Sequence, residues 1–264
     1  MPPLWFRIEH ALLAMSQLPT LGLGQATFNN GEPLMSSRVI VALDYADPTA
    51  MFDFVDRIEP EHCRLKVGKQ LFTKAGTQAV NELVARGFDV FLDLKYHDIP
   101  NTVAGACEAA RKLGVWMVNI HAMGGLAMMQ AASDVMQGDD APILIAVTVL
   151  TSSGKEELEA LGISSTPEEM VGQLSQMAHQ AGLDGVVCSA REVAMIKRLT
   201  ADDFVTVTPG IRPAGSAAQD QKRIMTPQDA VDQGADYLVI GRPVTQAEDP
   251  CKVLRTINSE IGEC

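Results

Sequence analysis

The segment FLDLKYHDIPNT, at residues 91–102, holds two carboxylates and an amine in a D-x-K-x-x-D run. The apolar residues before Asp93 favour a buried strand, and the residues after Lys95 favour a turn and a helix start. Alternate side chains of a strand lie on one face, about 6–7 Å apart. Asp93 and Lys95 are therefore predicted to place a carboxylate beside an ammonium that can donate a proton. Asp98 falls on the loop that follows.

Other polar residues stand at the ends of the neighbouring predicted strands. Asp44 ends the first strand and Lys66 lies in the second, so both could join Asp93 and Lys95 in an alternating array of acids and bases. Opposite charges within about 4–6 Å keep one another ionised, and we expect both lysines to stay protonated. A structural ion-pair network that closes the top of the fold is the alternative. Further polar residues of this kind are His121, Thr148, Thr151, Thr208 and Arg242, and all are expected to face one mouth.

Two segments near the C-terminus are predicted to bind an anion. The segment TPGIRPAGSAAQDQKRI (208–224) is rich in glycine, contains Arg212 and Gln221, and is longer than a typical connection, as lids often are. In IGRPV (240–244), Gly241 allows backbone amides to approach an anion, and Arg242 offers a planar fork of donors. Together they fit the phosphate site that follows strands seven and eight of a (β/α)8 barrel. The alternative for Gly241 and Arg242 is a plain turn with a solvated arginine.

The elements that must position these residues alternate along the chain. Short apolar runs rich in β-branched residues are each followed by a segment with helical periodicity, and helix-capping patterns mark several starts. This pattern predicts a single (β/α)8 TIM barrel over residues 36–264. An open doubly wound sheet is the rival, but ALDYADP after the first strand lacks its G-x-G-x-x-G fingerprint. The predicted strands are 38–44, 63–68, 89–95, 116–122, 143–150, 184–189, 204–210 and 236–243, and the caps are Asp47, Ser153 with Glu156, Thr166 with Glu169, Ser189 with Glu192, and Thr226.

Composition excludes several classes of function. With a formal net charge of −12 and no basic run, general binding to nucleic acid or to anionic membranes is not expected. Five cysteines without a CxxC pair suggest neither a disulfide framework nor a zinc site, and they favour reduced thiols in a cytoplasmic protein. Residues 1–35 carry few charges and are predicted to be a loosely ordered extension. His97 and His121 lack a partner at catalytic spacing and are interpreted as structural.

The order of ALDY, RLKVGK, FLDLKYHDIPNT, VTVLTS, VTPGIRP and VIGRPVTQ resembles the bacterial form of the orotidine 5′-phosphate decarboxylase family over about residues 38–258. The resemblance implies a lyase that decarboxylates orotidine 5′-monophosphate to UMP, the last step of de novo pyrimidine nucleotide synthesis, without cofactor or metal. It also implies a homodimer with active sites at the subunit interface.

The same resemblance implies a role for each matching residue. Lys95 would protonate C6, Asp93 would lie against the substrate carboxylate, and Asp44 and Lys66 would hold the ribose hydroxyls. The remaining assignments are Asp98 and Thr102 to the partner's site, Thr151 to the pyrimidine amide edge, and Arg212, Gln221, Gly241 and Arg242 to the ribose and phosphate end.

Two other functions stay open at this point. The first is a magnesium-dependent sugar-phosphate decarboxylase or aldolase, which shares D-x-K-x-x-D but is expected to carry a carboxylate in strand two, where this chain has Lys66. The second is a non-catalytic nucleotide-binding regulator on the same barrel, against which the intact Asp93 and Lys95 argue.

Overall fold

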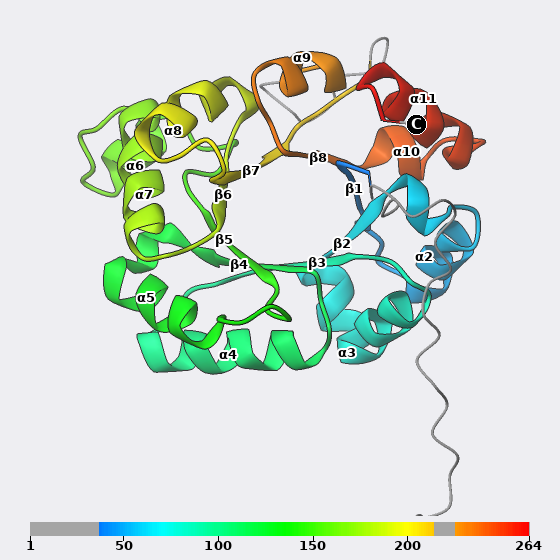
Figure 1. Ribbon diagram of the computed structural model, residues 1–264, viewed down its shortest axis with the longest axis horizontal. Coiled ribbons are helices and arrows are strands. Elements are labelled where there is room, and N and C mark those ends of the chain that lie inside the picture. The colour runs from blue at the N-terminus through cyan, green and yellow to red at the C-terminus, as the bar shows by residue number, and fades with distance from the viewer. Residues whose placement is uncertain (1–36, 214–224, 264) are drawn as a thin grey trace, which may run out of the picture. The chain divides into compact units, whose positions relative to one another are not determined.

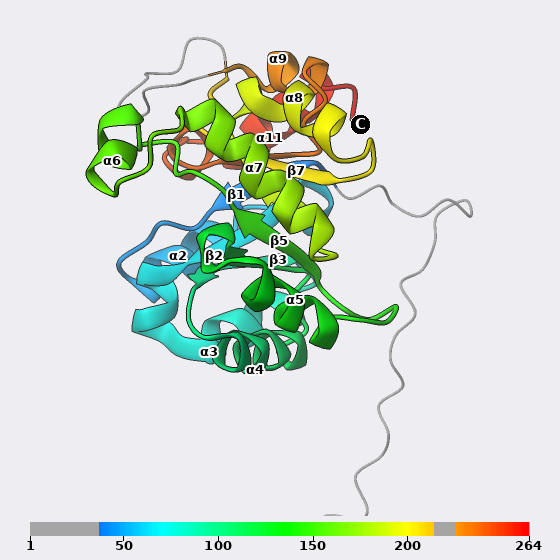
Figure 2. The same ribbon diagram turned by 90° about the vertical axis from the view of Figure 1, so that its left-hand side faces the viewer.

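The computed structural model describes residues 37–213 and 225–263, and these residues form a closed barrel of eight parallel strands in sequential order. Figure 1 shows the strands as a central ring with the helices outside it. Figure 2 shows helices α3 to α5 on one side of the strands and α7 to α9 on the opposite side. The predicted (β/α)8 barrel is confirmed. The strands are β1 (Val39–Ala42), β2 (Arg64–Gly68), β3 (Val90–Tyr96), β4 (Met117–His121), β5 (Ile143–Val147), β6 (Gly185–Val187), β7 (Val205–Pro209) and β8 (Tyr237–Ile240).

The helices follow the strands in the alternation that the sequence predicts. The α-helices are α2 (Pro48–Val55), α3 (Lys69–Ala85), α4 (Pro100–Lys112), α5 (Leu126–Val135), α6 (Lys155–Ala160), α7 (Pro167–Gln180), α8 (Val193–Leu199), α9 (Pro227–Asp232), α10 (Arg242–Thr245) and α11 (Pro250–Glu260). The described residues also form the short 3-10 helices η2 (Pro60–His62), η3 (Ala122–Gly124) and η4 (Ala190–Glu192).

Side-chain alternation along the strands produces two buried clusters. The larger cluster packs the strands against the helices and includes Val39, Val41 and Leu92. The smaller cluster fills the barrel interior and includes Ile40, Phe91 and Val207. Because side chains on one face of a strand recur every two residues, the residue two places after Phe91 continues along the interior face. That residue is Asp93, so the apolar packing of β3 determines where its carboxylate lies.

Most of the predicted helix caps are present. Asp47 and Thr226 accept hydrogen bonds from the first turns of α2 and α9, and Thr166 forms a capping box with Glu169 at α7. The Ser189 amide donates to Glu192 at 2.8 Å. The capping box predicted at Ser153 and Glu156 is wrong, because the observed box starts one residue later, at Gly154. Gly154 is the N-cap of α6, and its amide donates to Glu157 at 2.7 Å, whereas the Ser153 amide is used in a turn to Leu150.

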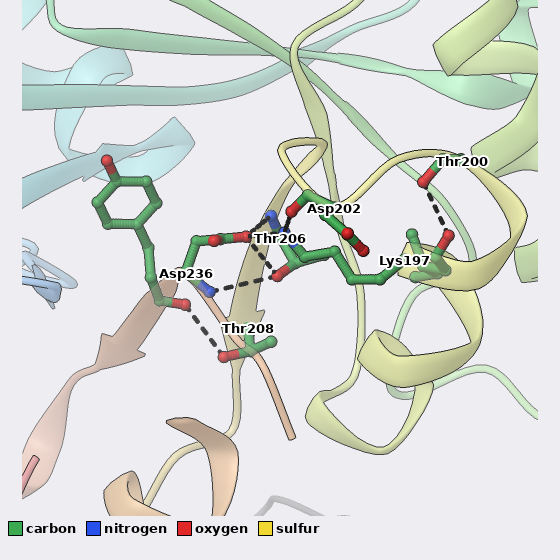
Figure 3. Close-up of polar contacts among 8 residues, drawn as sticks. Lys197, Thr200, Asp202, Thr206, Thr208 and Asp236 are labelled. Atoms are coloured by element: carbon green, nitrogen blue, oxygen red, sulfur yellow. Dashed lines mark hydrogen bonds and ion pairs between the residues drawn. The ribbon is translucent and has the colours of Figure 1, made fainter. Parts of the chain in front are cut away.

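A polar network ties β7 to β8 at the N-terminal end of the barrel (Figure 3). Asp236 Oδ2 accepts hydrogen bonds from the Thr206 amide at 2.7 Å and from the Thr206 hydroxyl at 2.8 Å. Lys197 Nζ, on α8, lies 2.9 Å from the same oxygen and also donates to the Asp202 carbonyl at 2.8 Å. Thr208, two residues further along β7, donates instead to the Tyr237 carbonyl at 3.0 Å. The contacts of Asp236 stabilise strand pairing at the end of the barrel opposite to the predicted site.

A cation–π stack lies at the same end. The Arg64 guanidinium stands 4.3 Å from the ring centre of Trp116 and 5.0 Å from that of Tyr237, and its Nε lies 3.1 Å from Asp89. Such an arrangement combines a planar cation with aromatic faces and a carboxylate. Polar chemistry at this end is thus used to hold the barrel together.

The structure does not test the predicted N-terminal extension. The extension at 1–35 and its boundary at residue 36 lie outside the described residues and stay predictions. No helix in residues 37–213 and 225–263 has the length and apolar character needed to cross a membrane.

Candidate active site

Four charged side chains from three adjacent strand ends meet at the C-terminal end of the barrel. Lys66 Nζ lies 3.0 Å from Asp93 Oδ2 and 3.7 Å from Asp44 Oδ1. Lys95 Nζ lies 2.5 Å from the other carboxylate oxygen of Asp93. Charges therefore alternate in the order Asp44, Lys66, Asp93, Lys95, and we call these four residues the charged array. The structure brings together all four residues that the sequence placed at these strand ends.

The array is largely removed from solvent around Asp93, which is 8% exposed. Burial is the largest single influence and acts to raise the pKa of this carboxyl. Two other effects act in the opposite direction: the nearby ammonium groups of Lys66 and Lys95, and the hydrogen bonds from Lys95 and Asn119. Their sum exceeds the effect of burial and lowers the pKa of Asp93 to about 2. Asp93 is therefore ionised throughout the neutral range.

The backbone at Lys95 departs from regular strand geometry. Its φ is 53°, and among the described residues it is the one non-glycine residue with a positive φ. The pairing of β3 with β4 shifts register between Leu92 and Tyr96. The Lys95 amide donates to the side-chain oxygen of Asn119 at 2.8 Å. A left-handed backbone at a non-glycine residue is costly, and such strain is concentrated at functional sites.

Two adjoining cavities open at the array. One has a volume of about 620 Å³ and is lined by Asp44, Arg212, Gly241 and Arg242, among others. The other, about 190 Å³, is lined by Lys95, Thr151 and apolar side chains such as Phe91 and Val207. Both cavities are also lined by Lys66, Asp93, Pro209 and Val239. The array thus separates a cavity with two arginines from a smaller and more apolar one.

The arginine end of the larger cavity is suited to an anion. Arg212 is 7% exposed; burial lowers the pKa of its guanidinium, and the neighbouring Arg242 lowers it further. Arg212 Nη1 donates to the Ile211 carbonyl at 3.0 Å, but its buried Nε has no hydrogen-bond partner within the described residues. A buried donor without a partner is costly, and two neighbouring guanidinium groups repel one another. An anion bound between them would relieve both effects.

Gly241 forms part of the wall of this cavity. A Cβ built on it would meet Ala42 Cβ at 3.7 Å and Asp44 Oδ2 at 4.0 Å, which are ordinary contacts, but its backbone, with φ −106° and ψ −108°, lies outside the regions that residues with a Cβ favour. Glycine is therefore favoured here by the backbone conformation rather than by the packing of neighbouring side chains. The absence of a side chain here leaves room in the cavity beside Asp44.

Several predicted residues do not line either cavity. Asp98 accepts a hydrogen bond from the Ile99 amide at 2.6 Å, and Thr102 is exposed in the first turn of α4. Gln221 lies outside the described residues. Thr148, which was expected to face the mouth, is fully buried and donates to the Val187 carbonyl at 2.9 Å. Thr208 is also fully buried and donates to the Tyr237 backbone, so both expectations are wrong: these hydroxyls satisfy carbonyls of neighbouring strands.

The two histidines near the array stack on each other. The rings of His97 and His121 lie 5.5 Å apart between centres, and His121 Nδ1 accepts a hydrogen bond from the Met123 amide at 3.4 Å. Burial, the neighbouring His97 and nearby lysines lower the pKa of His121. These contacts agree with the structural interpretation of both residues, and His121 lines neither of the two cavities.

Sequence reasoning missed Asn119 and the residues Tyr45, Thr245 and Gln246 of the larger cavity. Asn119 is 0% exposed, and its Nδ2 donates to Asp93 Oδ1 at 2.7 Å. The available signal was an uncharged polar residue inside the apolar run WMVNIHA. Buried amides are normally hydrogen-bonded, which could have pointed to a polar partner on a neighbouring strand.

Possible metal ligands in the described part of the chain gather away from the array. Glu59, His62 and Cys251 offer ligand atoms within 4.8 Å of one another, from the segment before β2 and from the start of α11. None of these residues lines the two cavities at the array. Cys63, Cys107, Cys188 and Cys251 are free thiols.

The family model and the relatives described below agree on one family. A model of the orotidine 5′-phosphate decarboxylase / HUMPS family matches residues 37–257. The chain is 58% identical over 228 residues to an orotidine 5′-phosphate decarboxylase of Pseudoalteromonas translucida, covering 86% of this chain and 97% of that protein. It is 54% identical over 230 residues to another of that name from Psychromonas ingrahamii, covering 86% and 98%. The resemblance seen in the sequence motifs is confirmed.

A solved structure with the same name has the same fold. The crystal structure of orotidine 5′-phosphate decarboxylase from Lactobacillus acidophilus superposes with a TM-score of 0.76 at 38% identity. The match covers 84% of this chain and 98% of that one.

Proposed function

The chain belongs to the orotidine 5′-phosphate decarboxylase / HUMPS family, and on that premise we propose that it is a carboxy-lyase that converts orotidine 5′-monophosphate to UMP. This reaction is the last step of de novo pyrimidine nucleotide synthesis. The observation that carries the proposal is the position of the charged array between an arginine-lined cavity and a smaller apolar one. A nucleotide has a phosphate at one end and a base at the other, and the two cavities match that division.

Lys95 is the proposed proton donor. When the bond from C6 to the carboxylate breaks, carbon dioxide leaves and the electron pair remains on C6 as a carbanion. This carbanion cannot delocalise into the ring carbonyls as an enolate would, so fixed positive charge nearby must stabilise it. The Lys95 ammonium then transfers its proton to C6 and is left as a neutral amine. The smaller cavity, which Lys95 lines, is the proposed site of the pyrimidine, with Thr151 at its amide edge.

Asp93 is proposed to lie against the substrate carboxylate. Its lowered pKa keeps it charged, so a second carboxylate beside it is disfavoured in the bound substrate and this repulsion disappears when carbon dioxide leaves. Asp93 also bonds to both lysines of the array and so holds their ammonium groups in place. Asp44 and Lys66, at the boundary with the larger cavity, are proposed to hold the ribose hydroxyls.

The phosphate is proposed to bind between Arg212 and Arg242 in the larger cavity, with Gln221 as a further contact. Arg242 supplies the main bidentate fork. Binding energy from a group remote from the reacting carbon can hold the pyrimidine against the array, and such energy raises the rate when it is used in the transition state. Phosphate binding and carbanion chemistry are coupled in this way.

A homodimer with shared active sites is also proposed. Asp98 and Thr102 lie near the start of α4 and do not line the cavities of their own chain. Between them, Ile99 is 68% exposed. The proposal of a dimer rests on the family resemblance, in which the matching residues reach into the neighbouring subunit's site. On this proposal, Asp98 and Thr102 of each chain reach into the active site of the partner subunit. We also propose that the enzyme works in the cytoplasm.

The family description also covers relatives with other activities, and Lys66 argues against a magnesium-dependent one. In the alternative function considered above, strand two provides a carboxylate ligand. Here that position holds an ammonium, 3.0 Å from Asp93 and 3.7 Å from Asp44. A cation at this place opposes the binding of Mg²⁺ between the same carboxylates. We therefore propose that the reaction uses the side chains of the protein without a cofactor.

The test is to incubate purified protein with orotidine 5′-monophosphate in excess EDTA and to follow UMP formation. Turnover that is unchanged by EDTA is expected. Strict dependence on added Mg²⁺, or no UMP at all, would contradict the proposal. The Glu59, His62 and Cys251 group makes it useful to record thermal stability with and without EDTA, so that loss of a structural ion is not mistaken for loss of a catalytic one.

A further inference from the structure

We propose that Asn119 is a positioning residue that fixes Asp93 and Lys95 relative to one another. The inference rests on the proposed function, because it concerns the same decarboxylation. Asn119 lies in the middle of β4, is 0% exposed and lines neither cavity, so it is not placed to touch the substrate. It acts through the two residues that it bonds.

One side-chain amide makes both contacts. Asn119 Nδ2 donates to Asp93 Oδ1 at 2.7 Å, and Asn119 Oδ1 accepts from the Lys95 backbone amide at 2.8 Å. A primary amide is planar, so its donor and acceptor sit at a fixed separation. The carboxylate of Asp93 and the backbone of Lys95 are therefore tied to one rigid group on the neighbouring strand.

The first contact orients the carboxylate. Asp93 Oδ1 receives both the Asn119 amide and the Lys95 ammonium, whereas Asp93 Oδ2 faces Lys66 at 3.0 Å. Rotation of the Asp93 carboxylate about its terminal side-chain torsion would break the buried hydrogen bond from Asn119 Nδ2. This torsion is otherwise broad and poorly restricted. Asn119 thus helps to keep Lys95 paired with Asp93 Oδ1 and Lys66 paired with Asp93 Oδ2.

The second contact supports the unusual backbone of Lys95. The register shift between β3 and β4 occurs at this point of the ladder, and Lys95 adopts a φ of 53°. A buried amide that loses a ladder partner needs another acceptor. Asn119 Oδ1 supplies it, and so helps to hold a left-handed backbone that aims the Lys95 side chain at Asp93.

A buried, hydrogen-bonded asparagine could instead serve folding alone, and the test must separate these roles. In Asn119→Ala both contacts are lost. We expect kcat to fall about 10- to 100-fold, by analogy with the loss seen when groups that orient metal ligands are removed. The KM for orotidine 5′-monophosphate and the Kd for UMP are expected to stay within about threefold, because the residues that line the cavities are unchanged.

A matched control is available at the opposite end of the barrel. Thr206 is also 0% exposed, and its hydroxyl bonds to Asp236 (Figure 3). Thr206→Val removes a buried hydrogen bond of a strand residue without approaching the array. We expect it to lower the melting temperature while kcat changes less than about twofold. If Asn119→Ala and Thr206→Val lose stability alike and both keep the parental kcat, the positioning role is refuted.

The isosteric variant Asn119→Asp gives a second readout. The titratable groups around it are Asp93 and Lys95 on β3, Lys66 on β2 and His121 two residues further along β4. When protonated, the new carboxyl can donate to Asp93 and accept from Lys95. When ionised, it places a like charge against Asp93 Oδ1. The ratio of variant to parental kcat should therefore fall as the pH rises. A ratio that does not change with pH would contradict the inference.

Failure of the inference can be told apart from failure of the proposed function. If the parent does not form UMP, the proposed function fails. If the parent is active, the variants decide on Asn119. A crystal structure of Asn119→Ala is expected to show Lys95 displaced or its φ changed. An unchanged array in that structure, together with parental kcat, would overturn the positioning role.

Discussion

Lys66 Nζ lies 3.0 Å from Asp93 Oδ2, so the most buried carboxylate of the site is held between two ammonium groups. Neighbouring strands supply the two residues, since Lys66 in β2 pairs with Phe91, and Asp93 follows two places later in β3. Removing Lys66 or Asp93 would leave the other charge buried without its partner, which lowers the stability of the folded protein. The energetics of folding and of catalysis are thus linked at Asp93.

Stability should depend on the ionisation of Asp93. Its pKa of about 2 in the folded protein is below its ordinary value of 3.8, so the ion contributes stability that is complete above about pH 4 and is lost as the pH falls through about 2. The full contribution is about 2 kcal/mol, of which about half is lost by pH 3. Denaturant unfolding of the parent and of Asp93→Asn between pH 7 and pH 3 measures it. The gap between the two proteins should narrow by about 1 kcal/mol toward pH 3. A constant gap would contradict the explanation.

Because Lys95 has a left-handed backbone, glycine is expected to be more stable than alanine at this position, the reverse of the usual order in a helix. Glycine adopts a φ of 53° without the steric cost that a Cβ brings, so Lys95→Gly should be more stable than Lys95→Ala by about 1 kcal/mol. The matched pair is Arg255→Gly and Arg255→Ala in the exposed middle of α11, where glycine should be less stable by about 1 kcal/mol. Chemical denaturation of all four variants checks this. The same order at both positions would argue against strain at Lys95.

Gly241 and Gly185 should respond differently to the same substitution. Gly241→Ala meets no atom closer than 3.7 Å, so its cost to folding should be limited to backbone strain of about 1 kcal/mol, while the methyl group occupies cavity space and lowers kcat/KM about 10- to 100-fold. In Gly185→Ala the new Cβ would stand 2.1 Å from the Val205 carbonyl oxygen, so this variant should lose several degrees of melting temperature. Thermal melts and steady-state kinetics on both variants give the comparison. Parental kinetics in Gly241→Ala would contradict the assignment.

The proposed dimer with shared active sites predicts complementation between inactive chains. Lys95→Ala and Asp98→Ala are each expected to lose nearly all activity. In a mixed dimer one of the two sites regains both residues, so a random equal mixture should recover about one quarter of parental activity. Subunit exchange is verified with differently tagged chains. An absence of recovery after proven exchange would count against the exchange of Asp98 between subunits.

The barrel and much of the array could be predicted because local signals agree with the global fold. Each strand is a short apolar run, and Asp44, Lys66, Asp93 and Lys95 interrupt those runs where parallel strands end. The role of Thr148 could not be predicted, because a threonine at a strand end is equally able to face a cavity or to bond a neighbouring carbonyl. Periodicity does not decide between these alternatives.

Two other features depend on how separate strands meet. The left-handed backbone of Lys95 and its bond to Asn119 arise from the register shift between β3 and β4, which neither strand encodes alone. The proximity of Arg212 to Arg242 depends on the pairing of β7 with β8. Sequence motifs identified the arginines, but their mutual repulsion and the lack of a partner for Arg212 Nε among the described residues required the structure.

The role of Lys95 is the central claim, and one pair of measurements tests it most directly. Turnover of orotidine 5′-monophosphate and binding of a non-reactive UMP analogue are measured in parallel for the parent and for Lys95→Ala. The proposed mechanism predicts that the variant loses turnover while analogue binding remains detectable, because the arginine-lined cavity does not include Lys95. Turnover by Lys95→Ala at the parental rate would contradict it.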